Sequence, residues 1–312
     1  MKLIGVSAFI IAAALALAPW PVSAEEHEKT SEDFSAGPIG NNGEAPAKCN
    51  VTCPDHNRIW TGRWTTPQAT WGRDSVCGCV HWTYSEAEHW DTLDPAFAEC
   101  KTGTRQSPID LPTTTTSSTA TNTSRLDFQY VTEALKVMNN GHTVQAIYPA
   151  EFHSKLTLDG KTYSLMQFHF HAPSENHIGS EEFAMEGHFV HGNTAGKPVL
   201  VVAVMFREGD ENAALTQIWN KLPPTNPDAP TYKEIGDYNA SSLLPNNLSY
   251  YLFDGSLTTP PCGEGIKWVV LSTPVTVSAA QGTAFRTLFG NQNTNRPVQP
   301  LNARRVSQVT AP

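Results

Sequence analysis

Basic residues are scarce in this sequence, which has 21 lysines and arginines against 30 aspartates and glutamates and a net charge of −9. A negative chain is repelled by nucleic acid and by anionic membrane surfaces, so neither is expected as a partner. Long apolar runs are also missing after residue 24, and the polar end from Val306 to Pro312 has no hydrophobic tail of the lipid-anchor type. We therefore expect no membrane span in the mature protein.

The N-terminus carries the longest apolar stretch, from residue 3 to residue 20. It follows the single charge of Lys2 and leads into Val22-Ser23-Ala24, just before two glutamates. One charge, a short apolar region and small residues are typical of a cleaved signal peptide, here residues 1–24. An uncleaved anchor is the alternative, but two prolines interrupt the run. The protein is predicted to be secreted, into an extracellular or periplasmic space.

Six cysteines in an exported chain favour disulfides, because that compartment is oxidising. Four of them lie close together in the sequence, and their three possible pairings stay open; a second zinc site is the less favoured alternative. The clustered cysteines are Cys49, Cys53, Cys77 and Cys79.

Four triplets fit the pattern for N-glycosylation, a pattern that is common by chance. They begin at Asn50, Asn122, Asn239 and Asn247.

The sequence changes character near residue 80. Residues 25–80 are rich in Gly, Pro, Thr and Asn without periodicity, which predicts an irregular extension held by its own disulfides. Residues 81–308 alternate short apolar runs with turn residues and are expected to form the main domain, with 309–312 as a tail. The Thr/Ser-rich run 113–119 is expected to be a solvated loop.

Within the main domain, strands outnumber helices. Val199–Phe206 is a continuous apolar run suited to a central strand, and Ile266–Leu271 is another candidate. Residues 212–222 and 278–288 look helical; in the second, Ser278 is placed to act as the N-cap with Gln281 reaching back. Many strands and few short helices predict a mainly β, mostly antiparallel architecture.

The segment Gln167-Phe168-His169-Phe170-His171 carries the main chemical signal. Alternate side chains of a strand share a face, so Gln167, His169 and His171 point to one side and the phenylalanines to the other. Histidines two apart on a strand are separated by roughly 6–7 Å at Cα. Both imidazoles can therefore reach one metal ion at about 2.0–2.1 Å.

A second candidate strand runs from Met185 to His191, with Glu186, His188 and Val190 on one face. If it pairs antiparallel with the first, His188 supplies a third nitrogen. Three histidines and one open position are typical of catalytic zinc. Gln167 and Glu186 each precede a ligand by two residues on the same face, where they can accept its second N–H. The competing interpretation is three ordinary histidines within a sheet.

These histidines, with Ser174-Glu175 and Glu186-x-His188-x-Val190-His191, resemble the signature of the α-class carbonic anhydrases. Further matches follow in the family's order and extend over about residues 81–306. The resemblance implies a single domain around a large, mostly antiparallel twisted sheet with a few short peripheral helices. The additional motifs are Arg105-Gln106-Ser107-Pro108-Ile109-Asp110, Asn139-Asn140-Gly141-His142, Gly255-Ser256-Leu257-Thr258-Thr259-Pro260-Pro261-Cys262, Trp268 and Asn295-Arg296-Pro297-Val298-Gln299-Pro300-Leu301-Asn302.

The same resemblance implies the reversible hydration of carbon dioxide to bicarbonate and a proton by zinc-bound hydroxide, with water as co-substrate and Zn²⁺ as the cofactor. Thr258 would accept the proton of the hydroxide and donate its own to Glu175. His142 would carry the released proton to solvent, because an imidazole titrates near neutral pH. The implied pocket for carbon dioxide and bicarbonate consists of Val190, Val201, Leu257, Thr258, Thr259 and Trp268.

Other positions match by resemblance alone. Tyr84, Asn140 and Gln145 correspond to the family's water chain, although Gln145 departs from the asparagine of fast members. Cys100 and Cys262 correspond to the disulfide of exported members. Two rival functions are a metal-free binding protein on the same scaffold and a zinc hydrolase acting on esters; the retained histidines oppose the first, and a narrow pocket would limit the second to a side activity.

Overall fold

The computed structural model describes residues 31–37, 39, 44–54, 58–65, 75–113, 116–119, 125–148, 153–226 and 228–311. The predicted signal peptide, residues 1–24, lies outside the described residues. Within these ranges, no helix has the length and apolar character needed to cross a bilayer.

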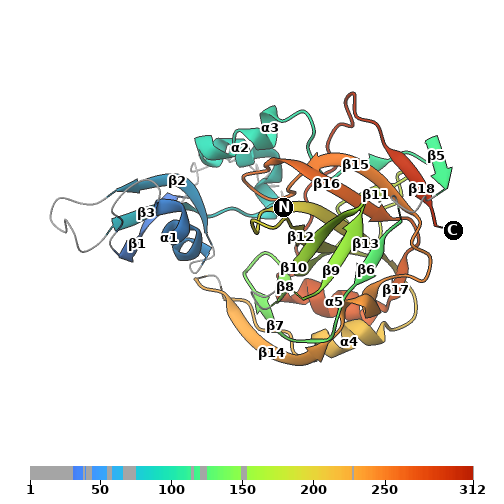
Figure 1. Cartoon of the computed structure of the whole chain (residues 1–312). Coiled ribbons are helices and arrows are strands. Elements are labelled where there is room, and N and C mark those ends of the chain that lie inside the picture. The colour runs from blue at the N-terminus through green and yellow to red at the C-terminus, as the bar shows by residue number, and fades with distance from the viewer. Residues whose placement is uncertain are drawn as a thin grey trace, which may run out of the picture.

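A 13-stranded sheet forms the centre of the larger lobe in Figure 1. The strands of this sheet lie in the order β14-β7-β8-β10-β12-β13-β16-β15-β18-β5. In addition, β17 pairs with β13, β9 pairs with β10 and β6 pairs with β9. Only β13–β16, β13–β17 and β18–β5 are parallel among its described pairings, which confirms the mainly antiparallel prediction. The strands are β5 (Thr116–Thr119), β6 (Asp127–Gln129), β7 (Glu133–Asn139), β8 (Val144–Ile147), β9 (Lys155–Leu158), β10 (Lys161–His171), β12 (Met185–Gly192), β13 (Pro198–Glu208), β14 (Thr231–Tyr238), β15 (Tyr250–Ser256), β16 (Glu264–Leu271), β17 (Val275–Val277) and β18 (Ser307–Thr310).

The two apolar runs expected as central strands lie in β13 and β16, where each is buried over most of its length. Both predicted helices exist but are shorter. They are α4 (Ala213–Trp219), capped by Asn212, and α5 (Ala279–Leu288), where Ser278 and Gln281 form the predicted capping box. The prediction of a loop over 113–119 is wrong for its second half, because Thr116–Thr119 pairs with β18. That pairing also carries the sheet to Thr310, past the expected boundary at 308.

Side-chain alternation divides the interior between the two faces of the sheet. The phenylalanines of β10 and β12 join the larger core, which Leu215 of α4 and Phe285 of α5 cover. His191 points into this core as well, and its Nε2 lies 2.7 Å from the Tyr130 hydroxyl. The opposite face carries a second apolar cluster that includes Val190, Val201 and Trp268.

Short elements surround the sheet. Four follow one another before its first strand: η3 (Tyr84–His89), α2 (Trp90–Leu93), η4 (Pro95–Phe97) and α3 (Glu99–Thr102). The 3-10 turn η5 (Ala240–Leu243) precedes β15, and β4 (Asp110–Leu111) pairs in parallel with β11 (His177–Ile178).

The N-terminal extension differs from the irregular structure predicted for 25–80. Its described residues form a three-stranded antiparallel sheet in the order β1-β3-β2 with one helix, seen as the smaller lobe in Figure 1. Two disulfides, Cys49–Cys77 and Cys53–Cys79, tie the helix to the middle strand and decide the pairing that the sequence left open. The elements are β1 (Ser31–Gly37), α1 (Ala45–Thr52), β2 (Ile59–Thr65) and β3 (Ser75–Val80).

Candidate active site

Strands β10 and β12 bring the three predicted histidines together. The strands pair antiparallel, as expected, and His169 lies directly opposite His188, with His171 two residues farther along β10. The ligand nitrogens of the three side chains all lie within 4.8 Å of one another. Among the described residues this is the one cluster of three or more His, Cys, Asp or Glu side chains with such spacing.

Each imidazole has an oxygen acceptor on its outer side. His169 Nδ1 donates to Gln167 Oε1 at 2.8 Å, and His171 Nδ1 donates to the Thr294 carbonyl at 2.6 Å. His188 Nε2 lies 3.0 Å from Glu186 Oε1. These partners fix the ring orientations and leave the remaining nitrogens free to bind a metal.

Burial sets the charge of the first two ligands. Desolvation, together with the neighbouring His188, holds the pKa of His169 and His171 well below the usual histidine value. Both rings are therefore neutral, which is the form that binds a metal. At His188, burial lowers the pKa, but the carboxylates of Glu186 and Glu175 outweigh it and raise the pKa above the usual value.

The donor set fits zinc. Three imidazoles with room for a fourth ligand are the typical catalytic arrangement of that ion. His171 Nε2 is buried and has no hydrogen-bond partner among the described residues, a costly arrangement unless the nitrogen binds a metal. The alternative zinc site on the clustered cysteines is excluded, because all four are in disulfides.

Glu186 connects the metal ligands to the loop after β10. Its Oε2 accepts the main-chain N–H groups of Glu175 at 2.6 Å and Asn176 at 2.7 Å, and its Oε1 accepts the Asn176 side-chain amide at 2.8 Å. Glu186 is fully buried. One carboxylate therefore positions both His188 and the main chain that carries Glu175.

Glu175 lies beside the histidines and is fully buried from solvent. Desolvation raises its pKa to about 7; the opposing influences are His188 and hydrogen bonds with Thr258 and the Arg296 main chain. The main-chain N–H of Arg296 donates to Glu175 Oε1 at 2.8 Å. The structure thus brings the predicted Glu175 and Thr258 into contact, although 83 positions separate them in the sequence.

An apolar row borders the metal ligands on the same face of the sheet. In the strand register, Val190 of β12 lies opposite Val201 of β13, which in turn lies opposite Trp268 of β16. The Trp268 ring contacts the His188 ring edge-on at 4.9 Å and stacks against Phe253. Leu257 is half-buried beside this cluster. Val190, Val201, Leu257 and Trp268 therefore lie together in one apolar cluster, which contacts the metal ligand His188 through Trp268.

His142 lies in the turn between β7 and β8. Its half-buried ring stacks on Trp82 at 3.9 Å between centroids with an interplanar angle of 9°. Asn140 Oδ1 accepts the main-chain N–H groups of His142 and Thr143, so the side chain of Asn140 shapes the turn.

The other two predicted relay residues contact the histidines themselves or their strand. The Tyr84 hydroxyl lies 3.4 Å from His171 Nδ1, and burial raises the pKa of Tyr84 well above its usual value. Gln145 of β8 pairs directly with His169 in the strand register.

The predicted disulfide Cys100–Cys262 is present and fastens the loop that carries Thr258. Buried polar contacts connect it to Glu175. Arg296 donates from Nη2 to the Cys100 carbonyl at 2.7 Å and from Nη1 to Gln106 Oε1 at 2.9 Å, and Gln106 Nε2 donates to the Cys262 carbonyl at 3.0 Å.

Four participants were not predicted in these roles. The Thr294 carbonyl and the Arg296 N–H are main-chain groups, which no side-chain pattern reveals. Asn176 follows Glu175 directly, but an isolated asparagine carries no signal. Arg296 and Gln106 do fall within the quoted motifs, which could have drawn attention to them.

Comparisons with known proteins agree with this geometry. Residues 85–310 match the family model of the eukaryotic-type carbonic anhydrases. The carbonic anhydrase of Neisseria gonorrhoeae is 44% identical over 228 residues, which cover 72% of this chain and 86% of that protein. The α-carbonic anhydrase of Thermovibrio ammonificans, solved with the inhibitor sulfanilamide, is 39% identical with a TM-score of 0.67 and covers 73% of this chain and 98% of its own.

A carbonic anhydrase of Pectobacterium carotovorum is 43% identical over 234 residues, covering 74% of this chain and 91% of that protein. The matched family model begins at residue 85, so the extension with its two disulfides lies outside it. The family match and the three-histidine centre together show that this chain belongs to the α-class carbonic anhydrases and is a zinc enzyme that interconverts carbon dioxide and bicarbonate.

Proposed function

We propose that Glu175 and Thr258 orient the attacking nucleophile in carbon dioxide hydration and that His142 exports the proton. The role of Glu175 and Thr258 is supported by the hydrogen bonds that fix the position of Glu175. Its own N–H is held by Glu186 and its carboxylate by the Arg296 N–H. The hydroxyl of Thr258 completes the arrangement beside the histidines.

His169, His171 and His188 would hold the zinc ion. When bound, zinc with three neutral ligands keeps its charge and lowers the pKa of water to about 7, which makes hydroxide available near neutral pH.

The direction of hydrogen bonding at Thr258 follows from proton counting. A threonine hydroxyl has one hydrogen. If Thr258 donates that hydrogen to Glu175, its oxygen can only accept from any other group. The nucleophile must then turn its own hydrogen to Thr258 and its lone pair toward the substrate. Glu175 would therefore be a positioning residue that acts through Thr258.

The apolar row of Val190, Val201 and Trp268 would hold carbon dioxide. The substrate is small, linear and uncharged, so a surface without hydrogen-bonding groups can accommodate it without competing for the metal. Leu257 and Thr259 would complete the pocket.

His142 would accept the proton released by each hydration cycle. Imidazole is the one unperturbed side chain that both accepts and releases protons near neutral pH. The ring is partly exposed on a turn, whereas the metal ligands His171 and His188 are buried. Tyr84, Asn140 and Gln145 would line the water path between them.

We further propose that the mature protein is exported. Three disulfides in the described residues suit an oxidising compartment. If the compartment permits glycosylation, Asn50 and Asn247 are the exposed acceptors among the described residues, and Asn122 lies outside those residues. Asn239 is a poorer one, because its side chain caps η5 and donates to the Tyr130 carbonyl.

Stopped-flow hydration of carbon dioxide tests the assignment. We expect rapid turnover by the zinc-loaded protein, loss of turnover after chelation and recovery on adding zinc. Turnover of an activated ester, measured in parallel, should be far slower. An ester preference would contradict the proposed substrate pocket.

A further inference from the structure

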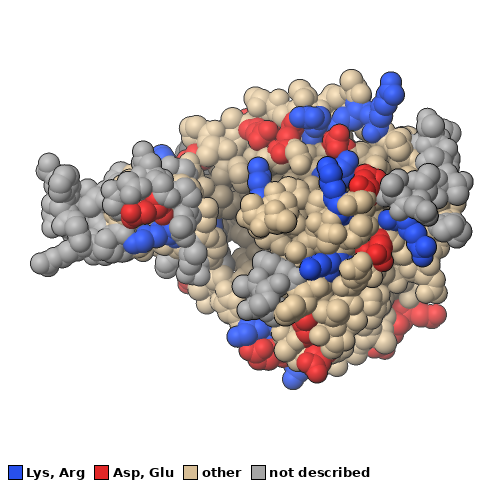
Figure 2. All heavy atoms as spheres, viewed as in Figure 1, with Lys and Arg blue, Asp and Glu red and all other residues tan. Residues whose placement is uncertain are grey.

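The disulfide-stapled extension docks against the segment that carries Trp82. Ile59 of β2 packs into the cluster that contains Val80, Trp82 and Trp90. Arg63 Nη2 forms an ion pair with Asp94 Oδ2 at 2.9 Å. Figure 2 shows the surface hollowed where this smaller lobe meets the larger one.

A cavity of about 240 Å³ lies between the two parts. The extension contributes Pro54, Arg58 and Ile59 to its wall. The main domain contributes His142 and the Trp82 ring on which it stacks, together with others that include Thr259. The proposed proton shuttle thus borders a space that a segment outside the matched family region helps to enclose.

Among the described residues that line this cavity, Arg58 is the only permanently charged side chain. Arg58 forms an ion pair with Glu32, whose Oε2 lies 3.5 Å from Arg58 Nη2; Glu32 is half exposed and is not among the described residues that line the cavity. The remaining lining residues are uncharged or, for His142, titratable. The described part of the lining therefore presents positive charge beside the shuttle in a protein whose net charge is −9.

We propose that Arg58 selects the proton acceptor of this enzyme by drawing anionic buffers to His142. The inference rests on the shuttle role proposed for His142. Protonated His142 must pass its proton to a base in solution before the next cycle, and the cavity is one approach to its ring. A guanidinium there attracts an anion such as hydrogen phosphate and repels a base whose conjugate acid is a cation, such as imidazole.

Buffer selectivity at saturating carbon dioxide tests the proposal. The turnover number is measured against concentration of phosphate and, separately, of imidazole, with the full-length zinc enzyme. Arg58→Gln should raise the half-saturating phosphate concentration relative to that of imidazole by roughly threefold to tenfold, the effect of one partly screened charge at close range. Arg58→Lys keeps the charge and should retain the wild-type ratio.

Arg305→Gln is the matched control, since it removes the same charge from an exposed arginine outside this cavity. It should leave the ratio unchanged. Circular dichroism and thermal unfolding identify any variant whose extension has lost its structure. If Arg58→Gln loses that structure, Arg58→Glu and Arg58→Lys provide the charge test instead. Arg58→Glu should raise the half-saturating phosphate concentration relative to that of imidazole, whereas Arg58→Lys should keep the wild-type ratio.

An unchanged phosphate-to-imidazole ratio in folded Arg58 variants would overturn the selection by Arg58. His142→Ala separates this failure from that of the shuttle itself. If His142→Ala abolishes the buffer-dependent part of turnover while the Arg58 variants keep the ratio, the shuttle stands and the selection fails. If His142→Ala has no effect on buffer dependence, the shuttle proposal itself fails.

Discussion

The Glu186 carboxylate accepts the main-chain N–H of Glu175 at 2.6 Å while its other oxygen lies 3.0 Å from His188 Nε2. A single buried side chain therefore holds a metal ligand and the residue that contacts Thr258. Zinc affinity and catalytic geometry should depend on it together.

Glu186→Ala removes every one of these acceptors, and we expect zinc affinity to fall by about 10- to 100-fold, as for other partners of metal ligands. Glu186→Gln keeps one oxygen acceptor, so its zinc affinity should fall by less than that of Glu186→Ala. Competition with a chromogenic chelator measures the affinities. Equal zinc binding by the alanine variant and the wild type would contradict a role for Glu186 in holding His188.

Thr258→Ala removes the hydroxyl that contacts Glu175, so the nucleophile loses its fixed orientation. We expect kcat/KM for carbon dioxide to fall by roughly 100-fold, the scale of losing one preorganised hydrogen bond at a reacting atom. Thr258→Ser retains the hydroxyl and should keep most of the activity. A serine variant as impaired as the alanine variant would point to packing by the methyl group instead.

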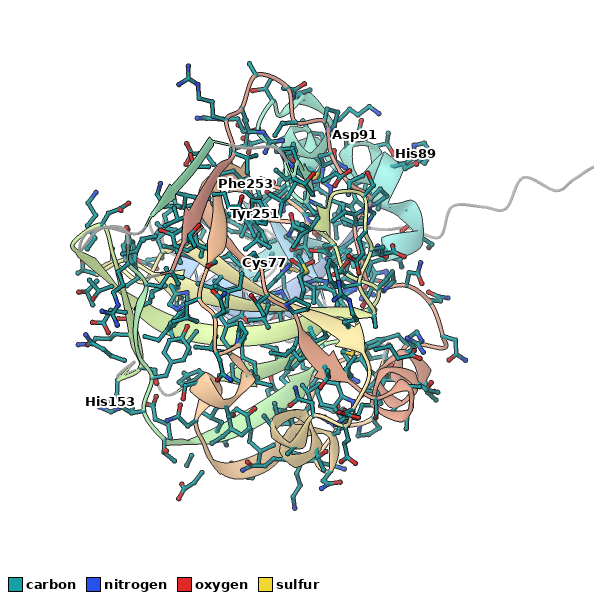
Figure 3. All side chains as sticks on the ribbon, turned by 90° about the vertical axis from the view of Figure 1, so that its right-hand side faces the viewer. Cys77, His89, Asp91, His153, Tyr251 and Phe253 are labelled. Atoms are coloured by element: carbon teal, nitrogen blue, oxygen red, sulfur yellow. A yellow bond between two sulfur atoms is a disulfide. The ribbon has the colours of Figure 1, made fainter. Side chains whose placement is uncertain are left out.

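His142→Ala should lower kcat by about tenfold or more in dilute buffer, since proton export limits saturated turnover, with little change in kcat/KM. Added imidazole should restore part of the loss. His153→Ala is the control, because His153 lies exposed at the periphery (Figure 3), away from the metal ligands. Stopped-flow assays at several buffer concentrations separate the two variants.

Replacing Cys100 and Cys262 by serine opens a loop that spans 162 positions. The chain-entropy argument gives a loss of unfolding free energy of about 5 kcal/mol as an upper value, and roughly 2–5 kcal/mol is expected. The same replacement of Cys49 and Cys77 opens a much shorter loop, of 28 positions, and should cost less unfolding free energy. Urea denaturation with both proteins zinc-loaded gives the comparison.

Burial lowers the pKa of His191 to about 3, against about 6.5 in an unfolded chain. The unfolded state therefore binds a proton between these values that the folded state does not. The free energy of unfolding should fall on acidification from pH 6.5 toward pH 3, by at most about 1.4 kcal/mol per pH unit from this residue. Above pH 6.5 this contribution is constant.

His191→Gln removes the titrating group while its amide can still hydrogen-bond the Tyr130 hydroxyl. Its unfolding free energy should depend less steeply on pH in this window. Denaturation at a series of pH values measures both slopes, and the difference isolates His191 from zinc release, which affects both proteins. Identical slopes would contradict the assignment.

The sequence by itself determined the features that depend on local spacing. The two-residue period of His169 and His171 already places both rings on one face of a strand, and Glu186 and His188 repeat the pattern. The Ser278–Gln281 capping box is equally local. Each of these patterns involves neighbours in the chain, so it is legible without knowledge of the fold.

Only the tertiary structure decided which groups complete the site. The Thr294 carbonyl and the Arg296 N–H reach the centre from more than 100 positions away, and main-chain atoms are the same in every residue. The pairing of the four clustered cysteines and the position of Arg58 beside His142 depend on how separate segments pack. Burial and long-range contact fix such relationships, and neither is encoded in the spacing of any single segment.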